Sequence, residues 1–109
     1  MKTYNRVELV GYLGNDPQCS TAANGSNCAR FRVATNYYRQ HQDGTAVKKT
    51  TWHRVVAWER LADKVPGNFI KGTHILVHGE LRHQTFKDKS GAIQNITEVR
   101  AVTLLNLDR

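Results

Sequence analysis

The chain has 109 residues and a formal net charge of +7, from 16 Lys and Arg against 9 Asp and Glu. A chain of this length forms one domain that buries roughly 60 to 70% of its unfolded surface, so no second domain is expected. No apolar run approaches the ~20 residues of a membrane span, and the first residues lack a signal-peptide pattern. We therefore expect a cytoplasmic protein with an anionic partner, either nucleic acid or an acidic membrane surface.

The first predicted strand covers residues 5–13 and carries apolar side chains on both faces. Because strand side chains alternate, Val7 and Leu9 share one face while Val10 and Tyr12 share the other. Neither face is strongly polar, so we expect another chain to cover part of this strand. The Gly-Asn-Asp-Pro sequence that follows predicts a turn or a sharp bend.

Two cysteines, Cys19 and Cys28, flank a turn signal at Asn24-Gly25. The two side chains could face each other across a hairpin, so a disulfide is geometrically conceivable. Thiols stay reduced in the cytosol, and we favour two unbonded cysteines packed as small apolar side chains.

The second predicted strand, residues 29–35, alternates apolar and basic side chains. Phe31 and Val33 point inward, whereas Arg30 and Arg32 point outward. The strand continues into a long hairpin with a polar turn, which forms an arm. This arm carries Tyr37, Tyr38, Arg39, Lys48 and Lys49.

The third predicted strand, residues 51–58, is rich in β-branched and aromatic residues. Trp52, Arg54 and Trp58 share one face, and His53 lies on the opposite, core-facing side. An arginine between two tryptophans indicates a face open to solvent or ligand, since arginine is seldom buried unpaired. Flat rings flanking a cation suit a single nucleic-acid strand. The alternative is a tryptophan that caps the core edge and is covered by the stem of Arg54.

Beyond this strand the apolar spacing becomes helical and then returns to strand period. We expect one short helix, with a break or a tight 3₁₀ stretch after Val65 because Pro66 cannot continue a helix. The apolar stripe of this helix consists of Leu61, Ala62, Val65, Phe69 and Ile70. Two strands follow, at about residues 73–86 and 93–107. Arg82 and Phe86 share the non-core face of the first of them.

The predicted order is three strands, a helix and two strands. This order is the layout of an OB-fold, an all-β, five-stranded Greek-key barrel with one helix between strands 3 and 4. In this chain a long β-hairpin arm is added to the barrel. The open face of such a barrel takes oligonucleotides or oligosaccharides, and the positive charge disfavours the sugar ligand.

The sequence contains no recognisable catalytic or metal-binding arrangement. The nine carboxylates are scattered, and neither cysteine lies in a nucleophile pattern with a histidine. His74 and His78 share a strand face, but no Cys-x-x-Cys or Glu-x-x-His accompanies them. We therefore predict a binding protein that is not an enzyme and uses no metal or cofactor.

Several motifs occur in a fixed order along nearly the whole chain. They are NRVELVGYLGNDP at 5–17, TWHRVV at 51–56, Lys71-Gly72, GELR at 79–82, Ser90-Gly91 and Thr97-Glu98-Val99. This combination resembles the bacterial single-stranded DNA-binding protein family. The resemblance implies an OB-fold, usually a homotetramer, that binds single strands with little sequence preference in replication, recombination and repair. It also implies a nucleoid-associated protein that forms a tetramer or a dimer.

The resemblance further assigns roles to residues. Trp52, Trp58 and Phe86 fall at the family's stacking aromatics, and Tyr38 lies one residue from a fourth such position. Arg54 and Arg82 fall at family cations near the strand. The remaining candidates for strand binding are Tyr37 and the cations Arg30, Arg32, Arg39, Lys48, Lys49 and Lys87. His53 matches a subunit contact, and Val7 and Leu9 are further candidates for the subunit interface.

Three features depart from the family pattern. Pro66-Gly67 interrupts the helix, and Asn95 stands where many relatives have an aromatic residue. The sequence ends at Arg109 without the family's flexible linker and acidic tip. We therefore expect residues 1–109 to form a single strand-binding domain, and the family's tail-mediated protein partners are not carried over to it.

The sequence thus predicts sequence-independent binding of single-stranded DNA, by base stacking on aromatic rings and by phosphate contacts. The nearest alternative is a primosome-type or RNA-binding OB-fold protein on the same scaffold. An alternative from another class is a structural interaction module whose working surface is the apolar face of the first strand.

Overall fold

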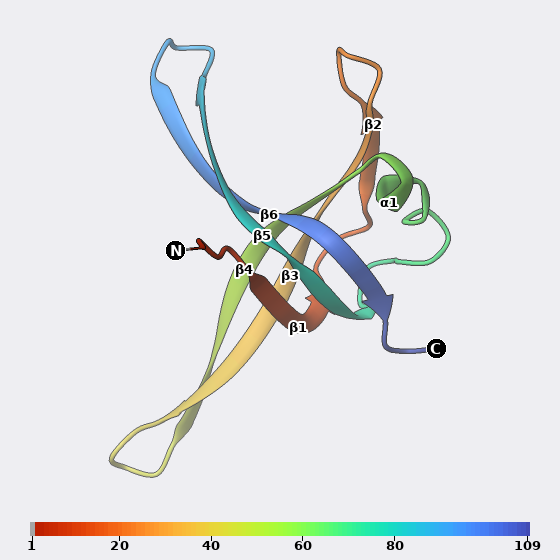
Figure 1. The fold of residues 1–109 in the computed structure, drawn as a ribbon. Coiled ribbons are helices and arrows are strands. Elements are labelled where there is room, and N and C mark those ends of the chain that lie inside the picture. The colour runs from red at the N-terminus through yellow and green to blue at the C-terminus, as the bar shows by residue number, and fades with distance from the viewer. Residues whose placement is uncertain (1) are drawn as a thin grey trace.

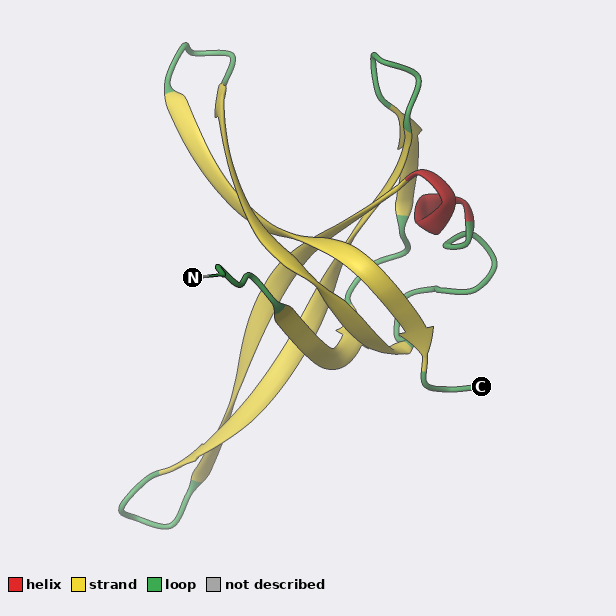
Figure 2. Cartoon of the chain, in the orientation of Figure 1, coloured by secondary structure: helices red, strands yellow, loops and turns green. Residues whose placement is uncertain are grey.

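The computed structural model describes residues 2–109 as a small barrel of strands with one short helix (Figure 1). The elements in chain order are β1 (Val7–Leu13), β2 (Gln18–Thr21), β3 (Asn27–Gln40), β4 (Ala46–Trp58), α1 (Glu59–Asp63), β5 (His74–Lys87) and β6 (Ile93–Asn106). Figure 2 shows that the β3–β4 and β5–β6 hairpins extend well beyond the barrel as two arms.

The barrel closes through five strands. Strands β1, β5, β6, β4 and β3 pair in that order, and a short pairing between β1 and β3 completes the ring. The pairings are antiparallel except between β4 and β6, where Val55 lies opposite Val99 in a parallel ladder. The predicted all-β OB-fold, with its helix between the third and fourth barrel strands, is therefore confirmed.

The short strand β2 is a continuation of β1. Both strands pair with the same edge of β3, β1 opposite Val33 and Ala34 and β2 opposite residues 27–30. Residues 14–17 thus face only residues 31–32 of β3. The surplus residues bend the chain, as the Gly-Asn-Asp-Pro sequence predicts.

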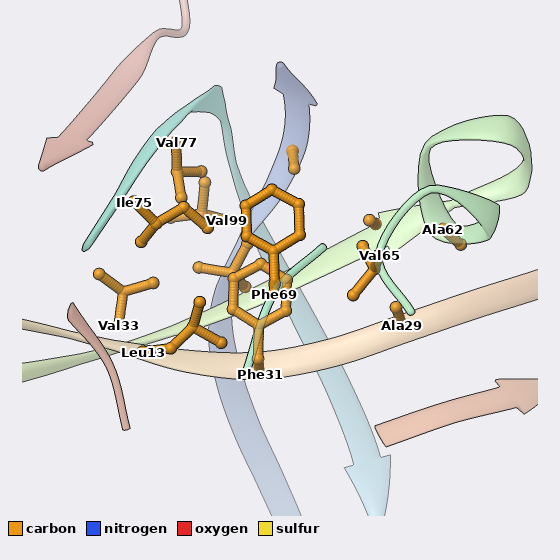
Figure 3. Close-up of a cluster of buried hydrophobic side chains, with 13 residues drawn as sticks. Leu13, Ala29, Phe31, Val33, Ala62, Val65, Phe69, Ile75, Val77 and Val99 are labelled. Carbon is orange, nitrogen blue, oxygen red and sulfur yellow. The ribbon is translucent and has the colours of Figure 1, made fainter. Parts of the chain in front are cut away.

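The core is filled by the inward positions of the strands, together with residues from α1 and the loop after it (Figure 3). Val33, Val55, Ile75 and Val77 are fully buried, and Phe31 lies among them. On β3 the outward neighbours Arg30 and Arg32 remain exposed, so the predicted alternation is confirmed. The inner face of β4 contributes Val55 and Ala57 in the same way.

The helix is shorter than the sequence predicts. It ends at Asp63, and the backbone N–H groups of Lys64 and Val65 donate to carbonyls three residues back, in 3₁₀ fashion. Pro66 cannot donate a helical hydrogen bond, and its ring clashes with the preceding turn. Val65 and Phe69 still enter the core, but Ile70 is 65% exposed. The expectation that Ile70 belongs to the apolar stripe is wrong.

The two cysteines are unbonded, as predicted. The register places Ser20, and not Cys19, directly opposite Cys28. Cys19 and Cys28 therefore lie on opposite faces of the hairpin, which prevents a disulfide between them. Cys28 is buried, with its Sγ 3.2 Å from the Ser20 hydroxyl. Cys19 is exposed, so the expectation that it is packed is wrong.

Asp88 organises the turn of the β5–β6 arm. Its Oδ1 accepts hydrogen bonds from the hydroxyl and the N–H of Ser90 and from the N–H of Ala92, and its Oδ2 accepts one from the Gln94 amide. These bonds favour the charged carboxylate, and the Ser90 hydroxyl contributes most to lowering the pKa of Asp88 to about 2.

We expect the Asp88 carboxyl to titrate near that value in an NMR pH titration. Its pKa is lower in the folded than in the unfolded chain, where it is ~3.9. Its contribution to stability is therefore complete above the unfolded pKa and is lost as the pH falls through the folded pKa of about 2. A titration midpoint close to that of an unfolded aspartate would show that these bonds do not hold the turn in solution.

Candidate nucleic-acid interface

The outward face of β3 and β4 gathers basic side chains beside an indole. Arg54 of β4 lies directly opposite Arg32 of β3, and the next outward pair along the ladder is Val56 with Arg30. Like charges placed directly opposite each other destabilise a sheet. Within residues 2–109 no carboxylate comes within ion-pair distance of Arg32 or Arg54. An anion bound between them would relieve the repulsion.

Trp52 lies next to these arginines and is half exposed, at 50%. The Cζ atom of Arg32 stands 5.1 Å from the centre of the indole ring, which is a cation–π distance. Another part of the ring lies against Gly14, where a Cβ atom would come within 2.1 Å of the Trp52 Cζ3 atom. The absence of a side chain at Gly14 therefore lets the indole settle on the bend between β1 and β2.

Replacing Gly14 by alanine is expected to displace the Trp52 ring, because the new Cβ would overlap it. The effect is measured best in a Trp58→Phe background, where Trp52 is the only tryptophan. We expect a shifted emission maximum and more efficient acrylamide quenching after Gly14→Ala. Unchanged emission and quenching would mean that the ring does not rest on Gly14.

Two cavities continue the basic surface across the barrel. One, of about 440 Å³, is lined by Arg30, Arg32 and Arg54 among others. The second, of about 300 Å³, lies between Trp58 on β4 and the Arg82 and Arg100 side chains on β5 and β6. Their volumes fall at the lower end of the range for ligand pockets. Both cavities are open hollows and not a single enclosed pocket. We call the surface that they form the basic strip.

The predicted binding residues divide into three groups. Trp52, Trp58, Arg30, Arg32, Arg54 and Arg82 line the strip formed by these two cavities and the adjoining one at Trp52. Phe86 lies farther out on the β5–β6 arm, on the same strand face as Arg82, with Lys87 at the end of the strand. The remaining candidates belong to the β3–β4 arm.

On the β3–β4 arm the register separates neighbouring side chains. Tyr38 pairs with Lys48 on the same sheet face as Arg32, whereas Tyr37 pairs with Lys49 on the opposite face. Arg39 also lies on that opposite face. All five side chains are exposed. A strand bound along the Arg32 face would therefore pass Tyr38 and Lys48, and it would need to wrap around the arm to meet the other three.

The sequence analysis missed two residues of the strip, Glu98 and Arg100. Both lie on the outward face of β6, where they alternate with the core residues Val99 and Ala101. The period-2 spacing from Val99 and Ala101 was the signal that could have found them. Arg100 adds a cation opposite Glu80, and Glu98 is a buried carboxylate in a surface that otherwise collects positive charge.

The three residues expected at a subunit interface lie on the inner side of their strands. His53 is partly buried, its Nε2 is 2.9 Å from the Thr35 hydroxyl, and burial lowers the pKa of its imidazole. Val7 and Leu9 pack against the core. These contacts give all three residues a role within the chain, and their role in a subunit contact stays a prediction.

The outer face of β1, β5 and β6 is apolar and exposed. Val10 lies opposite Leu76, which in turn lies opposite Leu105, so the three side chains form a row across three strands. Tyr12 stacks on His74 beside this row, with ring centres 4.8 Å apart. Val10, Tyr12 and Leu105 are each 49% exposed. Exposed apolar patches of this kind mark interaction surfaces.

Two negative observations concern the described residues, 2–109. Nowhere among them do three or more His, Cys, Asp or Glu side chains gather in a way that could hold a metal ion. In the same part of the chain, no helix is long and apolar enough to cross a membrane.

Comparison with known proteins gives consistent matches. Residues 4–107 match the Single-strand binding protein family. Single-stranded DNA-binding protein 1 of Chlorobaculum tepidum is 35% identical over 96 residues, which are 87% of this chain and 59% of that protein. The Single-stranded DNA-binding protein of Xanthomonas axonopodis pv. citri is 36% identical over 98 residues, 89% of this chain and 54% of that protein. The chain thus spans little more than half the length of these relatives.

A solved structure matches the fold over almost its full length. The Plasmodium falciparum SSB complex with ssDNA superposes with a TM-score of 0.85 and is 26% identical in sequence. The match covers 99% of this chain and 98% of that chain.

Proposed function

The chain belongs to the single-strand binding protein family, and we propose that it binds single-stranded DNA with little sequence preference. The observation that carries this proposal is the half-exposed Trp52 beside Arg32 and Arg54, which form no ion pair within residues 2–109. An aromatic ring offers a stacking surface to any base, and the guanidinium groups offer charge to the phosphates. The matched relatives and the matched complex carry names that agree with this ligand.

The proposed binding mode is a strand that follows the basic strip. Bases stack on Trp52 and Trp58, and Phe86 and Tyr38 extend the stacking surface onto the two arms. Phosphates meet the arginines of the strip. Arg32 and Arg54 lie beside Trp52, and Arg82 lines the same cavity as Trp58. Lys48, Lys87 and the cations on the far face of the β3–β4 arm strengthen binding mainly by releasing counterions from the phosphates. They do little to orient the strand.

We further infer that residues 1–109 act as one domain without catalytic activity, which protects single strands during replication, recombination and repair. Such work takes place on the chromosome, so a cytoplasmic, nucleoid-associated location is part of the same proposal. Assembly as a homotetramer, or as a dimer, is supported by the exposed apolar row of Val10, Leu76 and Leu105. Mass measurement in solution tests the assembly, and a monomer at all concentrations would contradict it.

Fluorescence anisotropy with labelled oligonucleotides tests the ligand. We expect tight binding of oligo(dT), much weaker binding of a duplex of equal length, and a log–log salt slope near −0.7 for each phosphate neutralised. If oligo(dT) and the duplex bind equally well, and both are released at moderate salt, the interaction is attraction between opposite charges without selection of single strands. An RNA oligomer of the same length serves as the third ligand, because a preference for it would favour an RNA-binding OB-fold protein.

A further inference from the structure

Glu98 is a buried carboxylate of the basic strip, and the proposed phosphate contacts do not explain its presence. It lies on the outward face of β6, directly opposite Arg82 of β5. Its side chain is only 4% exposed, and it takes part in lining three adjoining cavities of the strip. A buried carboxylate in a phosphate-binding surface repels the ligand's backbone, so its position calls for a specific partner.

The two oxygens of this carboxylate differ. Oε2 accepts a hydrogen bond from Nη1 of Arg30 at 2.7 Å. Oε1 is buried and has no hydrogen-bond partner within residues 2–109. Buried polar atoms are nearly always satisfied, and an unmade bond to a charged group is costly. Oε1 therefore accepts no hydrogen bond from the described residues, although the Glu98 side chain itself lines three adjoining cavities.

The chemistry of a DNA strand restricts what can satisfy Oε1. An ionised carboxylate only accepts hydrogen bonds, and a phosphate diester also only accepts them. Within a DNA strand the donors are the N–H groups of the bases. Cytosine, adenine and guanine carry exocyclic amino groups. On the Watson–Crick edge the amino group of cytosine and adenine lies next to a ring nitrogen that accepts, whereas that of guanine lies next to N1–H, and acceptance from cytosine N4 is a typical role of Glu.

We propose that Glu98 is a base-recognition residue, whose Oε1 accepts a hydrogen bond from the exocyclic amino group of a cytosine or adenine bound in the strip. This inference rests on the proposed function. Arg30, held beside Oε1 by the ion pair, offers a donor to the neighbouring ring nitrogen of the same base. Uracil and thymine present a carbonyl oxygen at that position, and their one donor, N3–H, lies between two carbonyl oxygens that repel a carboxylate.

The site is accessible through its neighbours. The guanidinium groups that surround Glu98 belong to long side chains that remain largely exposed, 47% for Arg30 and 48% for Arg82. Arg30 keeps its ion pair with Oε2, and displacement of the Arg82 side chain by an incoming base exposes Oε1 without any change in the barrel. The predicted result is a preference at one position of each bound strand, added to stacking that is indifferent to sequence.

The test compares oligo(dC) with oligo(dU) of the same length, in the protein and in Glu98→Gln. These strands share their backbone and lack the thymine methyl group. We work at mildly alkaline pH, where cytosine strands do not pair with themselves. We expect Glu98→Gln to weaken oligo(dC) binding by roughly tenfold, the effect of one hydrogen bond to a charged group. Oligo(dU) binding stays the same or tightens, because a glutamine amide can donate to the uracil carbonyl.

The matched control is Glu80→Gln, which removes a carboxylate that pairs with Arg82 but is 34% exposed. Glu80→Gln is expected to change the affinities for oligo(dC) and oligo(dU) by the same factor. If Glu98→Gln changes the affinities for both strands by the same factor, the proposal is overturned. Glu98 would then act only by competing with phosphate for Arg30. Failure of the unmutated protein to bind either strand would instead refute the proposed function.

A second measurement needs no variant and covers the case in which Glu98→Gln fails to fold. Strands built from pyrimidin-2-one deoxynucleotides keep the ring nitrogen of cytosine and lack its amino group. The unmutated protein is expected to bind them about tenfold more weakly than oligo(dC), as for the loss of one charged hydrogen bond. Equal affinity for the two strands would overturn the proposal.

Discussion

Replacing Trp52 or Trp58 by alanine is expected to weaken oligo(dT) binding by roughly 5- to 150-fold, which corresponds to ~1 to 3 kcal/mol for each stacked base. Trp52 is expected to show the larger loss, because its ring is half exposed and is supported by Gly14 and Arg32. Titrations of the two variants at constant salt measure these losses.

The control for the tryptophan variants is Lys48→Ala. Lys48 lies on the same face of the β3–β4 arm as Tyr38, and it is exposed. An exposed lysine contributes through counterion release, so this change should mainly flatten the salt slope, by roughly 0.7 for one phosphate contact. A loss in Lys48→Ala that exceeds both tryptophan losses would show that charge, and not stacking, dominates the affinity.

Replacing Ile75 by alanine is expected to lower the free energy of unfolding by about 2 to 5 kcal/mol. Ile75 is fully buried at the centre of the barrel, and the closed ring of strands leaves little freedom to collapse around the cavity. Urea unfolding followed by circular dichroism measures the change.

Ile70→Ala is the matched control, since it removes the same atoms from a side chain that is 65% exposed. We expect this variant to stay within about 0.5 kcal/mol of the unmutated protein. A large loss of stability in Ile70→Ala would mean that Ile70 packs into the core as part of the apolar stripe that the sequence pattern predicts.

The sequence was sufficient to predict the five strands of the barrel and their faces, but not the short strand β2. Alternation with period two is a local property, so Arg30 and Arg32 could be assigned to one face and Phe31 and Val33 to the other. The same rule placed Trp52 and Arg54 together. Strand order, with a helix after the third strand, then restricted the fold to a small set of barrels.

The sequence was insufficient where distant segments decide the outcome. Glu98 stands beside Arg30 only because β6 meets β4 in a parallel pairing, and no local pattern contains that contact. The register of β5 and β6 also shifts at His78 and Gly79, leaving Val102 without a partner and exposed. Such a bulge depends on the close approach of β6 to Gly79, where a Cβ would lie 2.2 Å from the Arg100 carbonyl oxygen.

The length of the helix depended on a competition that the apolar spacing does not reveal. Leu61, Val65 and Phe69 fit a helical stripe, yet Pro66 ends the helix before they complete it. Val65 and Phe69 reach the core from a series of turns instead. The break in the helix and the burial of Val65 and Phe69 were therefore predicted correctly, whereas the end of the helix at Asp63 and the exposure of Ile70 were not.

Bases are expected to stack on Trp52 and Trp58, and tryptophan fluorescence measures this stacking directly. Trp58→Phe and Trp52→Phe each leave one of the chain's two tryptophans as the reporter. On titration with oligo(dT), we predict strong quenching in both variants, and little quenching with a duplex of equal length. Binding of oligo(dT) that leaves the emission of both tryptophans unchanged would show that bases do not stack on these rings.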